Sequence, residues 1–147
     1  MNELEQQVYE RVKRNGFMVY NHIEMETVGP DSAVFKLDIR PESRNVYGMV
    51  HGGALYTLAD NAAGSAVHTD GRRYVTQSGS MNFLRNQAAG TIRAEARVRH
   101  RGRATSLVEV DITGEDGILL ATGEYSFFCV DRQRLEDQAR QEQTEHA

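Results

Sequence analysis

Residues 51–67 of the chain read HGGALYTLADNAAGSAV, a run of small and apolar residues with one charged side chain, Asp60. The run predicts a buried helix over roughly residues 52–68, because a helix that is apolar almost all round is normally covered by other elements. Burying a lone carboxylate is costly, and no basic residue lies between positions 52 and 67. The sequence therefore either pairs Asp60 with a group from elsewhere or presents it to a substrate.

The rest of the composition narrows the class of protein. With 147 residues, a net charge of -4 and 39% apolar residues, the chain is expected to form one soluble domain without the basic field of a nucleic-acid-binding protein. No run approaches the ~20 apolar residues of a membrane span, and the polar start does not resemble a signal peptide. We therefore expect a cytoplasmic protein with no membrane partner. The single cysteine, Cys129, lies in an apolar run and is expected to be a buried thiol.

Hydrophobic spacing predicts the elements around the central helix. Leu4, Val8 and Val12 indicate a short N-terminal helix over residues 2–15, with Gly16 as its stop. Alternating apolar and polar residues, broken by turn residues, predict strands followed at the end by a polar, frayed helical tail. The expected strands cover residues 17–28, 32–40, 74–84, 92–99, 104–113 and 118–130; residues 41–50 are expected to form a loop and 131–147 the tail.

One apolar helix among about six antiparallel strands predicts an α+β fold, a curved sheet wrapped around that helix. The short N-terminal helix, residues 1–16, would close one end of a single domain that spans residues 1–130. Such a sheet leaves its edge strands and part of the helix uncovered, and pairing with a second copy would cover both. We therefore expect a homodimer or a dimer of dimers.

Three elements at fixed spacing carry a family resemblance: Asn45, then His51-Gly52-Gly53, then Leu58-Ala59-Asp60. Together they resemble the signature of hotdog-fold acyl-CoA thioesterases of the phenylacetate-pathway type, within the 4-hydroxybenzoyl-CoA thioesterase superfamily. Residues 74–76 (YVT) and 82–85 (NFLR) resemble the third strand of the same family. The resemblance covers about residues 17–130, and the one departure is Asn86, where the family often has proline.

The resemblance implies the hotdog fold and the hydrolysis of an aryl or medium-chain acyl-CoA to the free acid and coenzyme A. Coenzyme A is then part of the substrate, and no further cofactor or metal is expected. Thioester hydrolysis needs a donor that stabilises the oxyanion and a carboxylate that attacks or activates water. The amide of Gly52, at a helix N-terminus, suits the first role, and Asp60 suits the second as nucleophile or general base.

Helix geometry adds a constraint on these two groups. Eight residues of helix separate Gly52 from Asp60, which is roughly 12 Å at about 1.5 Å per residue. One thioester cannot touch both groups on the same helix. We therefore expect each site to combine the Gly52 amide of one subunit with the Asp60 of the other, with two helices antiparallel across a two-fold axis.

Other residues receive roles from the resemblance. It implies that Asn45 orients the substrate or the attacking water, and that Thr76 assists Asp60 from a neighbouring strand. His51 belongs to the same signature, although a histidine just before a helix more often orders the loop by hydrogen bonds. Glycine at position 52 would let the acyl group approach closely, and Gly53 is expected to contact the substrate.

Arginines and large apolar residues are the expected substrate contacts. Between Gly71 and Thr105 stand eight arginines and one acid, Glu95. Arginine forks match phosphate oxygens, so some of these arginines could hold the nucleotide end of coenzyme A. The best placed, at strand ends and a turn, are Arg85, Arg101 and Arg103, whereas Arg93, Arg97 and Arg99 are expected on a solvated face. The acyl group is expected to meet Tyr56, Met81 and Phe83, with Tyr47 and Met49.

Two other functions fit the same fold. A hydratase or dehydratase acting on acyl thioesters would need an acid and a histidine in a different order, which the sequence does not contain. A non-catalytic acyl-CoA sensor could dispense with Asp60, which this chain retains.

Overall fold

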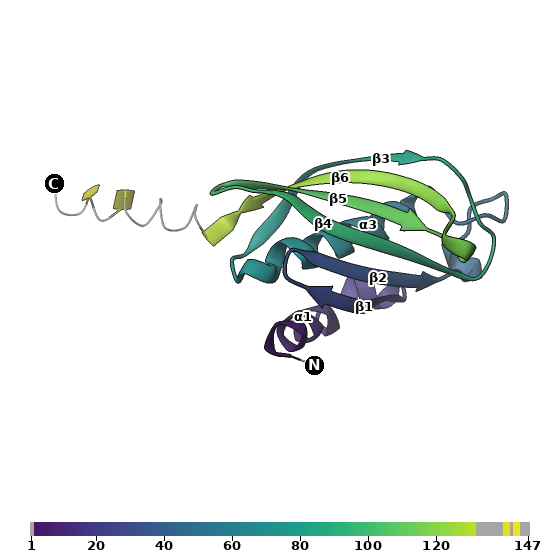
Figure 1. Cartoon of the computed structure of the whole chain (residues 1–147), viewed down its shortest axis with the longest axis horizontal. Helices are drawn as coiled ribbons and strands as arrows, with labels where there is room; N and C mark the ends of the chain where they lie inside the picture. Colours follow the sequence, from purple (N-terminus) through teal and green to yellow (C-terminus); the bar gives the residue numbers. More distant parts are fainter. Residues whose placement is uncertain (1, 132–139, 142, 145–147) are drawn as a thin grey trace.

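The computed structural model describes residues 2–131, 140–141 and 143–144. Six antiparallel strands form one sheet in the order β1-β2-β4-β5-β6-β3, and the sheet curves around the long helix α3 (Figure 1). The helix and sheet arrangement confirms the predicted α+β fold. Within the described residues, no helix is both long enough and apolar enough to span a membrane. The predicted tail lies largely outside the described residues.

The elements have the following bounds. The helices are α1 (Glu3–Lys13), α2 (Gly16–Tyr20) and α3 (Gly52–Val67), and the short 3-10 turns are η1 (Pro41–Ser43), η2 (His68–Asp70) and η3 (Glu115–Gly117). The strands are β1 (Ile23–Gly29), β2 (Ser32–Asp38), β3 (Tyr74–Phe83), β4 (Thr91–Arg101), β5 (Thr105–Thr113) and β6 (Leu119–Cys129).

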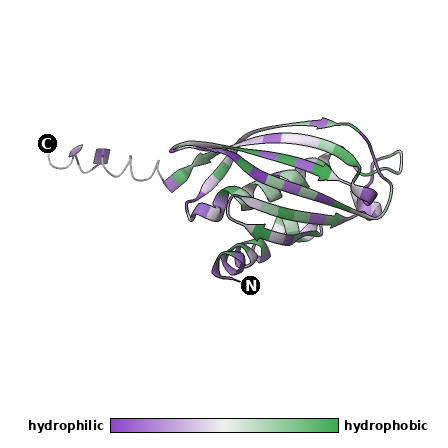
Figure 2. Cartoon of the chain, viewed as in Figure 1, coloured by the Kyte–Doolittle hydropathy of each residue, from purple (hydrophilic) through white to green (hydrophobic). Residues whose placement is uncertain are grey.

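The core lies between α3 and the concave face of the sheet. Helix α3 buries small side chains, including Ala59, Ala62 and Ala63, and this allows the helix to approach the strands closely. On the strands, buried and exposed residues alternate as predicted: in β2 the side chains of Phe35 and Leu37 point inward. Figure 2 shows this alternation as changing green and purple bands along the strands.

The N-terminal region differs from the expectation in two respects. Residues 17–20 were predicted as part of the first strand, but they belong to α2, and β1 begins only at Ile23. Gly16 was predicted to stop the first helix, yet it is the first residue of α2, whose N-cap is Asn15. The Asn15 side chain accepts a hydrogen bond from the Met18 amide at 3.1 Å, which starts a new helix where a strand was expected.

The outer face of the sheet carries the expected solvated arginines. Arg93 pairs with Glu26 at 2.8 Å, Arg99 pairs with Glu109 at 2.7 Å, and Arg97 lies 3.5 Å from a carboxylate oxygen of Asp111. Cys129 is buried, as predicted.

Strand β3 lies at one edge of the sheet and is unusually open for a ten-residue strand. It pairs only with β6, and most of its side chains are exposed. Val75 and Phe83 are each about half exposed, at 52% and 53%. A long, exposed edge strand is a site at which another chain can add.

Candidate active site

Helix α3 begins at a tight N-terminal cap made by His51. The ring Nδ1 of His51 accepts a hydrogen bond from the Gly53 amide at 2.7 Å. A Cβ atom on residue 53 would lie 2.9 Å from that nitrogen, so the cap requires glycine at this position. His51 therefore orders the start of the helix through a hydrogen bond, and Gly53 is the residue that its ring caps.

The Gly52 amide is the free donor at this helix end. Among the described residues, no acceptor lies within hydrogen-bond distance of its N–H. The ring of Phe83 lies beside it, because a Cβ on residue 52 would be 3.5 Å from two of the ring carbons. An unpaired amide at a helix N-terminus can donate a hydrogen bond to an oxygen atom on which negative charge develops, and so stabilise that charge.

Asp60 lies two turns further along α3 and contacts β3. The hydroxyl of Thr76 donates a hydrogen bond to Asp60 Oδ1 at 2.8 Å. Partial burial raises the pKa of Asp60 above the ordinary value of 3.8, and the Thr76 hydrogen bond opposes part of that rise. Asp60 and Thr76, for which the family resemblance implied a shared role, are therefore in direct contact. The other carboxylate oxygen of Asp60, Oδ2, has no hydrogen-bond partner among the described residues.

Asp60 and Thr76 line a cavity of about 170 Å³ between α3, the N-terminal helices and the sheet. The cavity does not include three residues predicted to hold the acyl group, Tyr56, Met81 and Phe83. Its other lining residues are Arg11, Val12, Asn15, Met18, Asn61, Gly64, Ser65, His68, Tyr74 and Phe127. Sequence reasoning did not assign these residues to the site: four of the ten come from the N-terminal region, outside the family motif, and the other six are brought together only by the packing of α3 against the sheet.

The side chains that were expected to contact the acyl group, but do not line the Asp60 cavity, have other neighbours. Tyr56 stacks edge-on against Tyr125, with ring centroids 5.3 Å apart, and both rings crowd against Gly79 of β3. Met81 packs against the core. Tyr47 is 85% exposed in the loop before α3 and lines no shared cavity with Asp60.

Asn45 organises the loop that leads into α3. Its Oδ1 atom accepts hydrogen bonds from the amides of Tyr47 at 2.9 Å and Met49 at 3.2 Å. A bridge between Arg44 and Val50 closes the same loop. The Asn45 side-chain amide donates to none of the described residues, so it is available to a substrate or a water.

The three arginines proposed for phosphate binding do not form one patch. Arg101 is not free: its guanidinium contacts Asp31 at 2.7 Å and Asp70 at 2.8 Å, which argues against a role with coenzyme A. Arg85 and Arg103 are exposed and have no side-chain partner among the described residues. They lie at opposite ends of the ten-residue strand β3, roughly 30 Å apart, so one chain cannot use both on one phosphate group.

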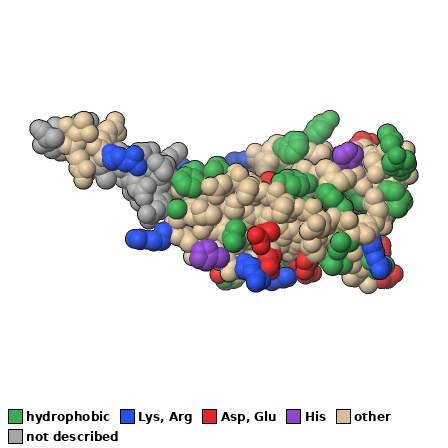
Figure 3. Space-filling model, turned by 90° about the horizontal axis from the view of Figure 1, so that it is seen from above, with side chains coloured by type: hydrophobic (Ala, Val, Ile, Leu, Met, Phe, Trp, Pro, Cys, Tyr) green, Lys and Arg blue, Asp and Glu red, His purple; other side chains and the backbone are tan. Residues whose placement is uncertain are grey.

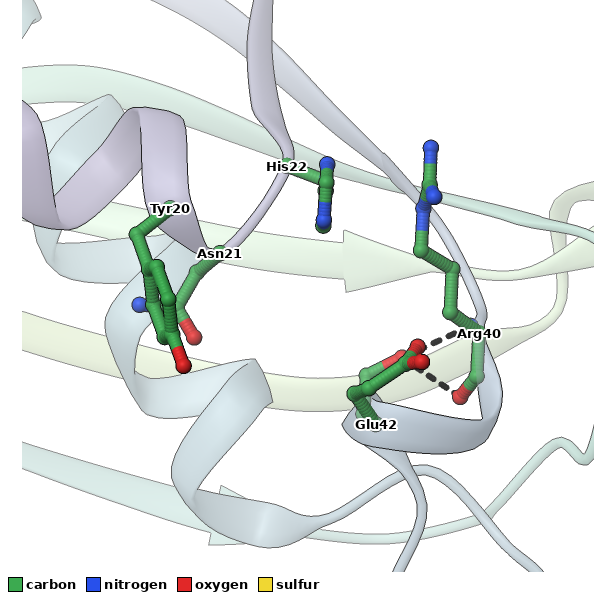
Figure 4. A pocket seen from close by; sticks show the side chains of 6 residues that line it. Tyr20, Asn21, His22, Arg40 and Glu42 are labelled. Carbon is green, nitrogen blue, oxygen red and sulfur yellow. Dashed lines mark hydrogen bonds between the residues drawn. The ribbon is translucent and has the colours of Figure 1, made fainter.

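A second, larger cavity of about 500 Å³ lies beside α2, away from Asp60. Figure 4 shows Tyr20, Asn21 and His22 on one side of it, and Arg40 and Glu42 on the other.

Within the described part of the chain, no group of three or more His, Cys, Asp or Glu side chains could hold a metal ion.

Comparisons with known proteins show the family to which the chain belongs. The model of the thioesterase superfamily matches residues 47–121. A putative esterase of Mycobacterium tuberculosis is 30% identical over 108 residues, which cover 69% of this chain and 77% of that protein. The acyl-coenzyme A thioesterase PaaI of Escherichia coli is 31% identical over 94 residues, which cover 63% of this chain and 67% of that protein.

Solved structures extend the likeness to the whole fold. A hypothetical thioesterase protein of Streptococcus pneumoniae, solved with coenzyme A, superposes with a TM-score of 0.75 at 28% identity, over 80% of this chain and 95% of that chain. The structure of E. coli PaaI superposes with a TM-score of 0.80 over 86% of this chain and 96% of that chain, at 23% identity.

Proposed function

Because the chain belongs to the thioesterase superfamily and is an acyl-CoA thioesterase of the hotdog fold, we propose that it hydrolyses its substrate at a site shared by two subunits. Asp60 of one subunit and the Gly52 amide of the other then act on the same thioester. The observation that carries this proposal is the separation of the two groups along a single helix, α3.

The reaction needs only the groups named and one water. The Gly52 amide donates a hydrogen bond to the carbonyl oxygen, which gains negative charge as the carbonyl carbon is attacked. Asp60 uses its free Oδ2 to remove a proton from the attacking water, or attacks the carbon itself and is released by water in a second step. In both routes the C–S bond breaks, the sulfur takes a proton, and the products are a carboxylic acid and coenzyme A.

The open face of the chain supports the homodimer. The edge strand β3 and the neighbouring side of α3 carry exposed apolar side chains, among them Val75, Phe83 and Tyr56. Figure 3, which views the molecule from above, shows hydrophobic side chains at several places on this face. A second copy placed there with α3 antiparallel would cover these side chains and would bring Gly52 of each chain to Asp60 of the other.

The substrate would lie across this interface. Its acyl group enters the 170 Å³ cavity next to Asp60, and its nucleotide end stays outside. Arg85, two residues after β3 and on the same end of the strand as Phe83, is the better placed arginine for a phosphate of coenzyme A. Asn45 would orient the substrate or the water with its free amide.

The test is the release of free thiol from a panel of aryl- and medium-chain acyl-CoAs. Asp60→Asn removes the base and is expected to lower kcat by at least ~10²-fold while substrate still binds. Asp116→Asn is the matched control, since Asp116 is exposed in a left-handed turn that asparagine also tolerates. Equal turnover by wild type and Asp60→Asn would refute the role of Asp60.

A further inference from the structure

The cavity that holds Asp60 is chemically different at its two ends. One end carries Asp60 and Thr76, and the other carries Arg11 of α1, Ser65 of α3 and His68 of η2. Asp60, Gly64 and His68 are spaced four residues apart, so each lies about 6 Å further along the same face of the helix. Val12, Met18 and Phe127 contribute apolar walls, and Asn15, Asn61 and Tyr74 contribute polar groups.

Arg11 is the unusual residue of this cavity. Its Nη1 atom is buried and has no hydrogen-bond partner, and no described residue forms an ion pair with its guanidinium. The other partly buried arginine near this end of α3, Arg101, has two carboxylate partners. Leaving a buried guanidinium nitrogen without an acceptor is costly, so the cavity is built to receive an acceptor at this end.

The neighbouring polar groups do not satisfy Arg11. Both ring nitrogens of His68 are engaged: Nδ1 contacts the Gly64 carbonyl oxygen at 2.6 Å, and Nε2 accepts from the Tyr74 amide at 3.2 Å. These bonds leave the ring without a free acceptor nitrogen for the Arg11 guanidinium. Ser65 is only 8% exposed, and its hydroxyl makes no hydrogen bond with the described residues. At this end of the cavity, two groups therefore have no hydrogen-bond partner among the described residues, Nη1 of Arg11 and the Ser65 hydroxyl.

Resting on the proposed function, we propose that the preferred substrates are ω-carboxyacyl-CoAs, whose far carboxylate is bound by Arg11 and Ser65. The guanidinium supplies the positive charge, and the serine hydroxyl supplies a further hydrogen-bond donor. The methylene groups between the thioester carbonyl and the far carboxylate contact the apolar walls. An apolar acyl tail in the same place would leave the guanidinium unsatisfied.

The volume of the cavity sets the length of this acyl group. At ~30 Å³ for each water-sized group, 170 Å³ holds about six non-hydrogen atoms. A five-carbon acyl chain that ends in a carboxylate has that number of atoms beyond its thioester carbonyl. Short dicarboxylic acids linked to coenzyme A at one end are therefore the substrate class that fits both the size and the charge of the cavity.

The experiment compares glutaryl-CoA with pentanoyl-CoA, which share the five-carbon chain and differ in the terminal carboxylate. The wild type is expected to have the higher kcat/KM for glutaryl-CoA. Arg11→Gln is expected to lower the glutaryl to pentanoyl ratio about tenfold to a hundredfold, and Arg11→Lys to lower it less, because a charged hydrogen bond is lost or only weakened. Arg14→Gln is the matched control and should keep the wild-type ratio, because Arg14 is exposed at the C-cap of α1, three residues after Arg11.

Two results would overturn the inference: a wild type that prefers pentanoyl-CoA, or an Arg11→Gln variant that keeps the wild-type ratio. The first needs no variant, so it decides the question even if Arg11→Gln does not fold. If neither thioester is hydrolysed, the binding of free glutarate and pentanoate decides the inference by itself, and the panel of aryl- and medium-chain acyl-CoAs decides the proposed function separately. Tighter binding of glutarate by wild type but not by Arg11→Gln supports it, and equal binding of the two acids contradicts it.

Discussion

Arg101 contacts four separate parts of the chain, so replacing it tests whether this residue stabilises the fold or binds the phosphate of coenzyme A. Its guanidinium contacts Asp31 in the β1–β2 turn and Asp70 in η2, donates to the Val67 carbonyl oxygen at 3.0 Å, and donates to the Tyr74 hydroxyl at 3.1 Å. The Val67 carbonyl belongs to the C-terminal end of α3, where a positive charge is favourable. Arg101→Met keeps the aliphatic stem and removes all of these bonds.

The size of the effect follows from the burial of the pair. The side chains of Arg101 and Asp70 are 22% and 19% exposed, and removing one partner of a fully buried pair costs ~3–5 kcal/mol. Solvent screens part of this pair, and Asp70 keeps hydrogen bonds from Tyr74 and Arg72, so ~2 kcal/mol is expected here. For a chain of this size that corresponds to a decrease in Tm of roughly 4–8 °C.

The pH dependence provides a second signature. Burial alone would raise the pKa of Asp70, but hydrogen bonds from Tyr74 and Arg72 and the charge of Arg101 outweigh it, so this pKa is lowered. A lowered acid pKa stabilises the fold above the unfolded-state pKa, and this contribution is lost as pH falls through the folded-state pKa. The stability difference between wild type and Arg101→Met should therefore shrink in acid.

The assay is thermal unfolding at pH 7 and in acid, together with the KM for an acyl-CoA. Arg103→Met is the control for unfolding, since Arg103 is exposed and has no side-chain partner among the described residues. The structural role of Arg101 would be refuted by an unchanged Tm accompanied by a large rise in KM. That result would return Arg101 to the phosphate-binding role that the sequence suggested.

Two further predictions concern the residues around α3. Thr76→Val removes the hydrogen bond that holds down the raised pKa of Asp60, so the acid limb of the kcat/KM profile should move to higher pH, because the carboxylate must be ionised to act. Ser78→Ala on the same strand should leave the limb in place, and a limb that stays in place in Thr76→Val would contradict the pairing. His51→Ala should lower the free energy of unfolding by ~1 kcal/mol through loss of the N-cap, whereas His51→Asn should restore it, because asparagine can accept from the Gly53 amide. Equal unfolding curves for the two variants would show that the cap contributes nothing.

The main elements could be predicted because burial leaves a clear period in the sequence. In β2, β4 and β5 one face is buried and the other is wet, so apolar residues recur at every second position. Helix α3 was recognisable from its length and its small residues. Helix α2 was missed because five residues are too few to show a helical period, and its apolar side chains also suit a strand.

The site was predictable only in part, for a different reason. The contact between Asp60 and Thr76 agrees with the pairing that the family resemblance implied. The partners of Arg101 lie 31 and 70 residues away along the chain, and spacing cannot reveal such contacts. Arg11 is one of several charged residues on an amphipathic helix, so only packing separates it from its exposed neighbours.

The most direct test of the shared site mixes two inactive variants. Gly52→Pro removes the oxyanion donor, and proline suits the first position of a helix, where a Cβ meets only the Phe83 ring at 3.5 Å. Asp60→Asn removes the carboxylate. If each site uses Gly52 from one subunit and Asp60 from the other, every mixed dimer regains one intact site, and an equal mixture should recover about a quarter of wild-type activity. Mixed dimers that form but stay inactive would contradict the account.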